Sequence, residues 1–378
     1  MAKDITERLN SLQKRRQGTD ERSQSRLNYD AQFDLLAKSV LTESWQKRTS
    51  KLYTRYALGA MQPVSADYTR ISLETAERVG KQLNQKLSRS VEFRLQGSVP
   101  LDVHIRGVSD VDLLVLDATY FSYTVAGRRS VLGQYTSPST LTSLDVLKAS
   151  RKDAENVLKV AYPAATVDCS GGKAISLSGG SLARPVDVVP AHWWDTPTYQ
   201  DTGQECDRGV TILNKKVPEV IDNLPFSHIK AINNADIFTL GGLKKAIRLT
   251  KNVKNDAENE TGASKLPSFD IAALLFHADR AALAAGAFYE LAILREAQRF
   301  LDWCFYNRNH SACFRTPDGS RVILDSERKF EGLLTISVEL DKLAAAVAKE
   351  QLGLPQEAEV PWASIDSALR TTYIPAAA

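Results

Sequence analysis

Two aspartates at the head of an unbroken apolar run constrain the fold of this chain more than any other feature. Asp110-Val111-Asp112 leads directly into residues 113–116, which read LLVL. A short apolar run of this kind indicates a buried strand. Because strand residues i and i+2 face the same side, Asp110 and Asp112 project together from one end of it. Two carboxylates so close raise each other's pKa, and a divalent cation such as Mg²⁺ would relieve the repulsion.

A third carboxylate, Asp187, lies at the centre of a second strand-like run, residues 184–190 (RPVDVVP). Three carboxylates can hold two metal ions and support in-line attack of a hydroxyl group on phosphorus. A D-x-D pair alone also suits a solvated strand end. Here the pair follows Gly97-Ser98, which should form a tight turn, and precedes the Asp187 strand. We therefore predict that the three aspartates are catalytic metal ligands.

A second set of residues suited to phosphate binding lies in the C-terminal half. Residues 241–254 form a basic helix after two glycines, and Lys244, Arg248 and Lys251 share one of its faces. An apolar helix should begin at Ser268, which would be its N-cap or a first-turn residue. A helix start offers free N–H groups and a positive dipole end to a phosphate. A solvated basic face and an ordinary cap remain the alternative interpretation.

These motifs resemble those of the DNA-polymerase-β-type nucleotidyltransferase superfamily. The resemblance is carried by Gly97-Ser98, by SDVDL at residues 109–113 and by VDVVP at residues 186–190. Within the superfamily, the chain is most similar to the CD-NTases of the CBASS anti-phage systems, which are bacterial relatives of cyclic GMP-AMP synthase. The segment RLTK, which ends at Lys251, and the later segment LPSF resemble the second lobe of oligoadenylate and cyclic GMP-AMP synthases.

The resemblance implies a reaction that uses two Mg²⁺ or Mn²⁺ ions. Asp110 and Asp112 would hold both ions, while Asp187 would hold the catalytic ion and help to activate the attacking hydroxyl. Backbone N–H groups at Gly97 and the hydroxyl of Ser98 would grip the triphosphate of the substrate.

In the second lobe, the resemblance assigns Lys251 and Ser268 to the triphosphate and Phe269 to stacking on a base. We expect both Lys251 and Ser268 to be accessible in the cleft. Two positions depart from the family's pattern. A second Gly-Thr pair usually follows Gly-Ser, whereas this chain has Asp102-Val103 there. The family normally has Tyr where this chain has Phe269, so the aromatic face is kept and a hydroxyl is lost.

We predict a two-lobed α+β fold of the polymerase-β type, with a mixed-sheet palm lobe and a helical C-terminal lobe that closes the cleft. Residues 1–64 should form an N-terminal helical segment packing on the core, residues 65–200 the catalytic lobe, and residues 201–378 the helical lobe. The catalytic lobe should begin with a long amphipathic helix over 65–89, capped by Ser65. Other helices are predicted near residues 241–255, 268–284, 286–305 and 329–351, with a mainly helical pattern from residue 212 onward.

The resemblance implies a nucleotidyltransferase that joins nucleoside triphosphates into a cyclic di- or trinucleotide and releases pyrophosphate. ATP and a second nucleoside triphosphate would be the substrates, and the product would be a second messenger that activates a separately encoded effector. One alternative is a template-independent nucleotidyltransferase that acts on RNA, tRNA or a small molecule such as an antibiotic. Another is a catalytically silent nucleotide-binding module, against which the presence of all three aspartates argues.

Composition limits the expected partners. A hydrophobic content of 43% and a charged content of 25% are ordinary for a globular protein. The net charge of +3 is too small to favour a stable nucleic-acid partner. The four cysteines include no C-x-x-C pair, so we expect no structural zinc. Without a signal peptide or an apolar run of membrane-spanning length, we expect no membrane contact and a cytoplasmic location, where nucleoside triphosphates are available.

Overall fold

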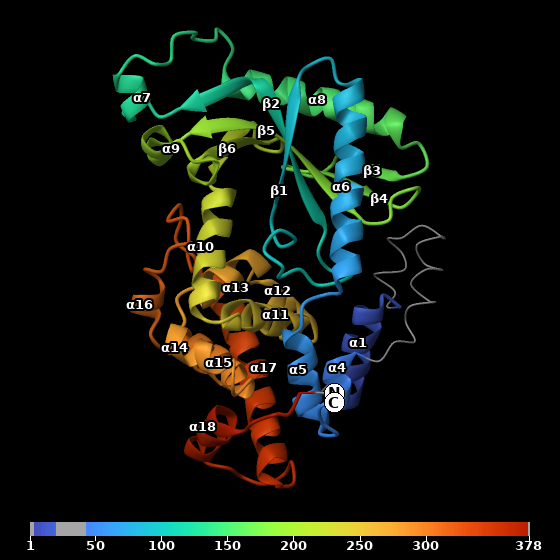
Figure 1. The fold of residues 1–378 in the computed structure, drawn as a ribbon, viewed down its shortest axis with the longest axis vertical. Helices are drawn as coiled ribbons and strands as arrows, with labels where there is room; N and C mark the ends of the chain where they lie inside the picture. Colours follow the sequence, from blue (N-terminus) through green and yellow to red (C-terminus); the bar gives the residue numbers. More distant parts are fainter. Residues whose placement is uncertain (1–3, 20–42, 377–378) are drawn as a thin grey trace.

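The computed structural model describes residues 4–19 and 43–376 and shows two lobes (Figure 1). A seven-stranded sheet with two long helices forms one lobe, and a cluster of helices forms the other. The predicted two-lobed α+β fold is therefore confirmed. No helix in the described part of the chain is long and apolar enough to cross a membrane.

The sheet is mixed, because its two central strands run parallel while every other pair of neighbours is antiparallel. One path of neighbours runs β1-β2-β5-β4-β3, and β6 and β7 continue the sheet from the other half of β5. The strands are β1 (Val91–Gln96), β2 (Val111–Tyr123), β3 (Thr166–Asp168), β4 (Ile175–Ser178), β5 (Val186–Asp195), β6 (Gly209–Asn214) and β7 (Glu219–Asn223).

The apolar run after the aspartates forms β2 because both faces of the sheet are covered there. Leu113 and Val115 belong to the cluster that includes residues of α6 and α8. Leu114 and Leu116 face the opposite way, into a cluster with residues of β5 and β6. A strand buried on both faces is expected to read as a continuous apolar run. The apolar run therefore determines the position of β2, and Asp110 and Asp112 lie at the start of this strand.

Two long helices and several short ones complete the sheet lobe. The predicted helix from residue 65 is confirmed as α6, and the Ser65 side chain accepts a hydrogen bond from the backbone N–H of Tyr68 at 3.3 Å. This N-cap fixes where the helix begins, next to the loop that follows β1 (Figure 1). The helices are α6 (Ala66–Lys86), α7 (Arg128–Val131), α8 (Ser143–Ala161), α9 (Pro197–Thr202) and the 3₁₀ helix η1 (Glu205–Asp207).

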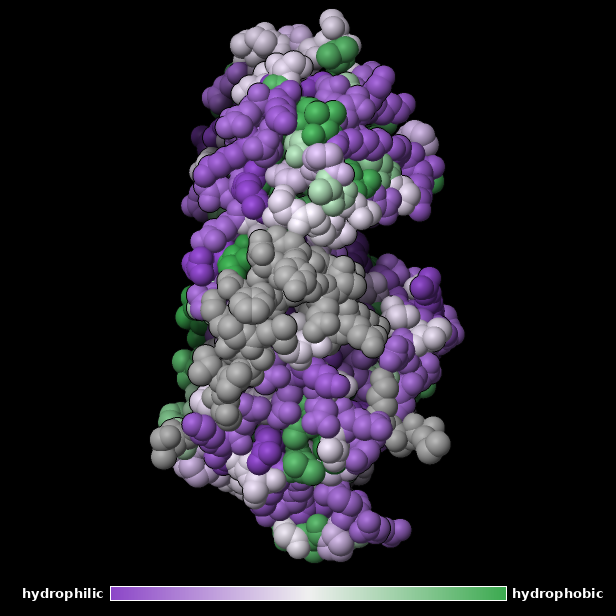
Figure 2. Space-filling view, turned by 90° about the vertical axis from the view of Figure 1, so that its right-hand side faces the viewer, coloured by the Kyte–Doolittle hydropathy of each residue, from purple (hydrophilic) through white to green (hydrophobic). Residues whose placement is uncertain are grey.

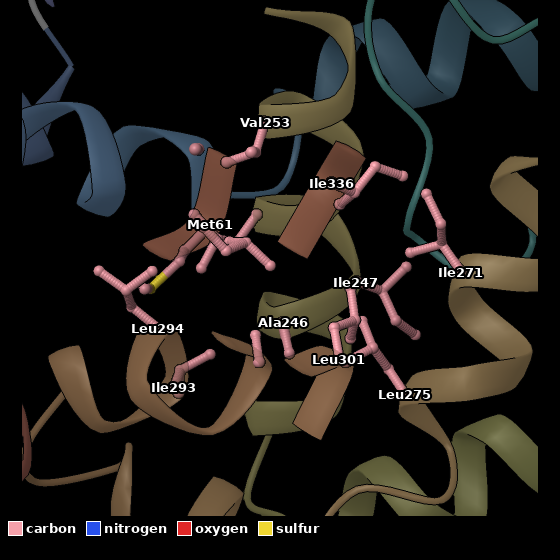
Figure 3. Packing of buried hydrophobic residues seen from close by; sticks show 14 of the residues in the cluster. Met61, Ala246, Ile247, Val253, Ile271, Leu275, Ile293, Leu294, Leu301 and Ile336 are labelled. Carbon is pink, nitrogen blue, oxygen red and sulfur yellow. The ribbon is translucent and has the colours of Figure 1, made fainter. Parts of the chain in front are cut away.

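The helical lobe is built around α11 (Gly242–Asn255). Its apolar side chains, among them Ala246 and Ile247, are fully buried with residues of four other helices: Met61 of α5, Leu275 of α13, Leu294 of α15 and Ile336 of α17 (Figure 3). Each such large apolar side chain contributes about 1.5–3 kcal/mol when it is fully buried. The orientation of α11, and hence of its basic face, is therefore set by the core of this lobe.

The remaining helices of this lobe come from both ends of the chain. They are α1 (Ile5–Gln17), α4 (Ser44–Lys47), α5 (Leu52–Met61), α10 (Pro225–Phe238), α12 (Glu260–Ser264), α13 (Ser268–Leu275), α14 (Arg280–Ala285), α15 (Leu291–Tyr306), α16 (Arg308–Ser311), α17 (Glu327–Leu352) and α18 (Trp362–Thr371). Ile5, Leu9 and Leu12 of α1 share one apolar cluster with the C-terminal helices. We propose that the described parts of the N-terminal segment, residues 4–19 and 43–64, belong to this lobe; residues 1–3 and 20–42 lie outside the description.

Two segments differ from the sequence prediction. The helix predicted over 268–284 is divided, because α14 has a cap of its own: the Asp279 carboxylate accepts from the N–H groups of Ala281 and Ala282. The mainly helical pattern predicted from residue 212 is wrong for β6 and β7, which pair through residues 210–223. Since the sheet continues past residue 200, we propose that the catalytic lobe extends to residue 223.

Candidate active site

The parallel pairing of β2 and β5 brings two of the predicted carboxylates together. Asp112 and Asp187 are direct partners in the register of the two strands. Ser176, the register partner of Asp187 on β4, donates from Oγ to Asp187 Oδ1 at 2.5 Å. Asp110 stands immediately before β2, close enough for its charge to act on Asp112. The three aspartates thus lie at one edge of the sheet lobe, at the start of the parallel strands.

The carboxyl group of Asp112 is electrostatically unfavourable as an anion. Burial, followed by the negative charges of Asp187 and Asp110, raises the pKa of Asp112 from 3.8 to about 7. The positive charge of Lys251 acts in the opposite direction and compensates only in part. An oxygen-only donor set with excess negative charge suits Mg²⁺ or Mn²⁺. Among the residues that the structure describes, no three His, Cys, Asp or Glu side chains are already gathered around a common metal position.

The tight turn predicted at Gly97-Ser98 is present and lies against these carboxylates. Gly97 has φ = +78°, and a Cβ atom added there would stand 2.2 Å from Asp112 Oδ2. Only glycine meets both conditions without strain. The Ser98 carbonyl accepts the N–H of Val103 at 3.1 Å, which closes the loop that follows. The backbone of the turn is therefore in direct contact with the Asp112 side chain.

The loop from Ser98 to His104 is held from the helical lobe. Asp102 stands where the resembled family usually has glycine, and it adopts φ = +54°, a conformation that Asp tolerates better than most residues. Its carbonyl accepts from Arg248 Nη1 at 2.7 Å, and the next carbonyl, of Val103, accepts from Lys251 Nζ at 2.6 Å. Two cations of α11 therefore fix this loop beside the carboxylates.

Lys251 is placed opposite the aspartates, but it is not accessible as the sequence suggested. Only 5% of the residue is exposed, because α11 and the loop after β1 close around it. Burial, then the neighbouring charges of Lys254 and Arg248, lowers the pKa of Lys251 from 10.5 to about 7. Lys251 holds the loop that leaves the Gly97 turn, and this turn packs against Asp112; the charges of Lys251 and Asp112 favour each other's ionised form.

Two residues that the sequence did not single out also lie here. Lys254, three residues after Lys251 on α11, donates from Nζ to the Leu266 carbonyl at 2.6 Å. Its spacing from Lys251 was the signal that could have identified it. His104 is 2% exposed, and its Nε2 lies 3.2 Å from Thr69 Oγ1. Burial and the charges of Lys251 and Arg248 lower the pKa of His104 to about 4, so this imidazole is neutral at pH 7.

Ser268 and Phe269 are the first two residues of α13, and the predicted helix start at Ser268 is therefore present. Pro267 is the N-cap and Ser268 the first helical residue, half-buried. Phe269 is 43% exposed, and its ring stacks on the ring of His228 with centroids 4.5 Å apart. The guanidinium of Arg321 lies 5.2 Å from the same ring. Part of the aromatic surface expected to receive a base is therefore already covered by His228.

The surface is hollowed between the two lobes. Figure 2 shows an indentation at the level where the sheet lobe meets the helical lobe. The aspartate edge and the face of α11 that carries Lys251 belong to opposite sides of this junction. A substrate with both an anionic part and bound cations would meet complementary charge from each lobe.

No family model matches the chain. Among known proteins, it is similar to the cyclic dinucleotide synthase CdnE of Yersinia aleksiciae, with 41% identity over 360 residues that cover 93% of this chain and 94% of the relative. It is also similar to the c-di-GMP synthase of Capnocytophaga granulosa, with 30% identity over 327 residues that cover 78% of this chain and 90% of that protein.

Two solved structures share the arrangement of the chain. The STING-associated CdnE c-di-GMP synthase from Capnocytophaga granulosa matches with a TM-score of 0.69 and 26% identity, over 90% of this chain and 97% of that one. The CdnE c-UMP-AMP synthase from Rhodothermus marinus, solved with Apcpp and Upnpp, matches with a TM-score of 0.58 over 85% of this chain and 100% of that one. At 18% identity, this second likeness concerns the fold alone.

Proposed function

The chain belongs to the CD-NTase family of cyclic-oligonucleotide-forming nucleotidyltransferases, and we propose that it joins two nucleoside triphosphates into a cyclic dinucleotide, with release of pyrophosphate. The observation that supports this most is the pairing of Asp112 with Asp187 across parallel strands, opposite the buried cation of Lys251. Carboxylates for metal and a cation for phosphate are the two charges that phosphoryl transfer requires.

The sheet lobe would supply the acidic half of the reaction site. Asp112 and Asp187 form its nucleus, and Asp110 would complete it as the ligand shell forms. Mg²⁺ or Mn²⁺ bound there would activate the attacking ribose hydroxyl and neutralise the charge that develops at the α-phosphate. Ser176 fixes the orientation of the Asp187 carboxylate through its hydrogen bond, so that less reorganisation is needed when the substrate arrives.

The turn after β1 and the helical lobe would hold the triphosphate. Gly97 lies against Asp112, and the backbone N–H groups of this turn and the Ser98 hydroxyl would be the donors. Among the described residues, Lys251 donates to the neutral Val103 carbonyl, and a phosphate oxygen would be a stronger acceptor. We propose that Lys251 exchanges this carbonyl for the triphosphate, with Ser268 as a further donor and with the exposed part of Phe269 beside the base.

The choice of bases stays open to experiment because the relatives differ. One relative is named a c-di-GMP synthase, and one structural neighbour a c-UMP-AMP synthase. The pair predicted from the sequence, ATP with a second nucleoside triphosphate, is one of the combinations to be tried. We also propose that the product activates a separately encoded effector, since a cyclic dinucleotide has no terminal phosphate through which it could act as a nucleotide donor.

The decisive experiment is to incubate the protein with each α-labelled triphosphate, singly and in pairs, with Mg²⁺ or Mn²⁺. In a cyclic product every labelled phosphate is closed onto a ribose, so we expect a small labelled product that resists phosphatase. A product in which all label remains phosphatase-sensitive would contradict cyclisation. Label that migrates only with added RNA, tRNA or a small-molecule acceptor would favour the template-independent alternative.

A further inference from the structure

The cations of α11 divide into two groups according to their partners. Near the start of the helix, the side chains of Lys244 and Lys245 have carboxylate partners. Lys244 Nζ lies 4.0 Å from Asp236 Oδ2, and Lys245 Nζ lies 2.8 Å from Glu290 Oε1. These two lysines are therefore neutralised within the protein, and their charges are explained by the stability of the helical lobe.

Further along the same helix, this neutralisation ends. Lys251 and Lys254 donate to backbone carbonyls, of Val103 and Leu266, at 2.6 Å each. In the described part of the chain, neither forms an ion pair with a carboxylate. Asp270, whose charge favours the protonated form of Lys254, is instead paired with Arg321 and Lys329. A buried lysine and a half-buried one without counter-ions are costly in free energy unless an anionic ligand joins them.

Lys254 is the neighbour of Lys251 on α11, so that the two side chains would meet neighbouring phosphates of one ligand. Three residues along an α-helix correspond to a rise of about 4.5 Å, and side chains at i and i+3 are neighbours. Lys251 interacts electrostatically with Asp112, on the side of the carboxylates. Lys254 follows three residues later on α11, and its Nζ contacts the carbonyl of Leu266, two residues before Ser268. Lys254 therefore stands between Lys251 and the start of α13.

We infer that Lys254 is a further binding residue for the donor triphosphate and that it contacts the terminal phosphate, while Lys251 contacts the part next to the reacting α-phosphate. The inference rests on the proposed function, because it takes the α-phosphate to lie at the aspartates. The two lysines are assigned by matching their order along α11 to the order of the phosphates in the triphosphate. The γ-phosphate is the group furthest from the carboxylates. The charge of Lys251 acts on Asp112, whereas Lys254 Nζ contacts the Leu266 carbonyl near the start of α13.

Competition between nucleotides tests this assignment. A fluorescent nucleoside triphosphate bound with Mg²⁺ is displaced by a non-hydrolysable triphosphate or by the matching diphosphate. We expect Lys254→Gln to weaken triphosphate binding roughly tenfold to a hundredfold, the range of one charge-assisted hydrogen bond, and to leave diphosphate binding nearly unchanged. We expect Lys251→Gln to weaken the binding of both nucleotides. Lys254→Arg should restore part of the preference for the triphosphate.

Lys245→Gln is the matched control, since it makes the same substitution on the same helix while Glu290 keeps its second partner, Arg48. It should leave both affinities unchanged. If Lys254 only stabilises the start of α13 through Leu266, Lys254→Gln will lower Tm and change the two affinities equally, and the inference is overturned. The proposed function is tested separately: wild-type protein that prefers the triphosphate but makes no cyclic product would contradict it. The Lys254 inference would still be decided by the two affinities.

Discussion

The carboxylate edge of the sheet lobe and the basic face of α11 are opposite in charge and alike in being poorly neutralised. At the sheet edge, burial and repulsion raise the pKa of Asp112 to about 7. On α11, burial and repulsion lower the pKa of Lys251 to about 7. Each group is thus shifted toward its neutral form, although the two attract each other. Neither lobe is therefore electrostatically complete, and metal ions and a triphosphate together would supply the charge that each lacks.

Removing charge from the sheet edge should have the largest effect. We expect Asp112→Asn and Asp187→Asn each to lower turnover by at least roughly 10²–10³-fold, because each removes a charged metal ligand from an otherwise intact strand pair. Asp168→Asn, on β3 of the same sheet, is the control and should keep activity, since its exposed carboxylate accepts hydrogen bonds from Ser170 and is not one of the three aspartates. Synthesis of the cyclic product by either active-site variant at wild-type rate would refute the metal-ligand assignment.

The same substitution at Asp112 should act on stability in the opposite direction. Because the buried carboxylate is repelled by Asp187 and Asp110, its replacement by a neutral amide removes an unfavourable charge. In metal-free buffer at pH 8, we expect the free energy of unfolding of Asp112→Asn to rise by roughly 1–3 kcal/mol, measured by urea titration. If the variant is less stable than the wild type, the attraction between Lys251 and the Asp112 carboxylate outweighs the cost of burying that carboxylate.

How far the sequence predicted each half of the site depends on the range of the interactions that build it. Asp110 and Asp112 could be placed on one face from strand periodicity alone, and the apolar run after them identified β2. Their partner Asp187 is 75 residues away. Its strand-like run marked it as the third carboxylate, but its position directly beside Asp112 depends on the pairing of β2 with β5. On α11, periodicity placed Arg248 and Lys251 together, but their burial depends on the loop that folds over them.

The errors in the fold have the same origin. β6 is a short apolar strand that owes its conformation to pairing with β5 and β7, and no local pattern distinguished it from the helices that follow. The stack of Phe269 on His228 joins α13 to α10 and likewise depends on tertiary packing. The accessible position expected for Lys251 was wrong because a single helix does not reveal which of its faces a second lobe will cover.

Gly97→Ala tests how closely the turn after β1 must approach the sheet edge. The new Cβ would stand 2.2 Å from Asp112 Oδ2, so the carboxylate must move, and φ = +78° adds strain of about 1 kcal/mol. We expect activity to fall more than about tenfold and stability to fall by about 1–3 kcal/mol. Gly133→Ala is the matched control, because Gly133 also has a positive φ while its Cβ would meet nothing within 4 Å. Its stability should fall by a similar strain energy, and its activity should be unchanged.

The two shifted pKa values predict a minimum in the stability of the metal-free protein near pH 7. The folded protein holds a proton on Asp112 between its unfolded pKa of 3.8 and about 7, so stability should fall as pH rises through this window. The unfolded chain holds the proton of Lys251 between about 7 and 10.5, so stability should rise again above pH 7. Each slope is at most about 1.4 kcal/mol per pH unit, the value for one proton. Urea midpoints measured from pH 5 to 9 would show the minimum.

Variants and metal separate the two limbs of that profile. Asp112→Asn should flatten the acid limb, and Lys251→Met should flatten the alkaline limb. Because Mg²⁺ must displace the proton of Asp112, added Mg²⁺ should raise Tm more at pH 8 than at pH 6. Equal stabilisation by Mg²⁺ at both pH values, or a profile that neither variant changes, would show that these two groups do not carry the charge imbalance between the lobes.

The smallest effect is expected at Phe269, where the helical lobe offers the base an uncharged surface. Tyr, the usual residue of the family at this position, keeps the ring that stacks on His228 and adds a hydroxyl to a side chain that is partly exposed. We therefore expect Phe269→Tyr to change the KM for nucleoside triphosphate less than about threefold. Phe269→Leu keeps an apolar side chain but removes the aromatic face, and base stacking of roughly 1–3 kcal/mol would be lost, which corresponds to a KM about fivefold to a hundredfold higher. An unchanged KM in the Leu variant would mean that the ring serves only the contact with His228, and that the base binds elsewhere in the junction between the lobes.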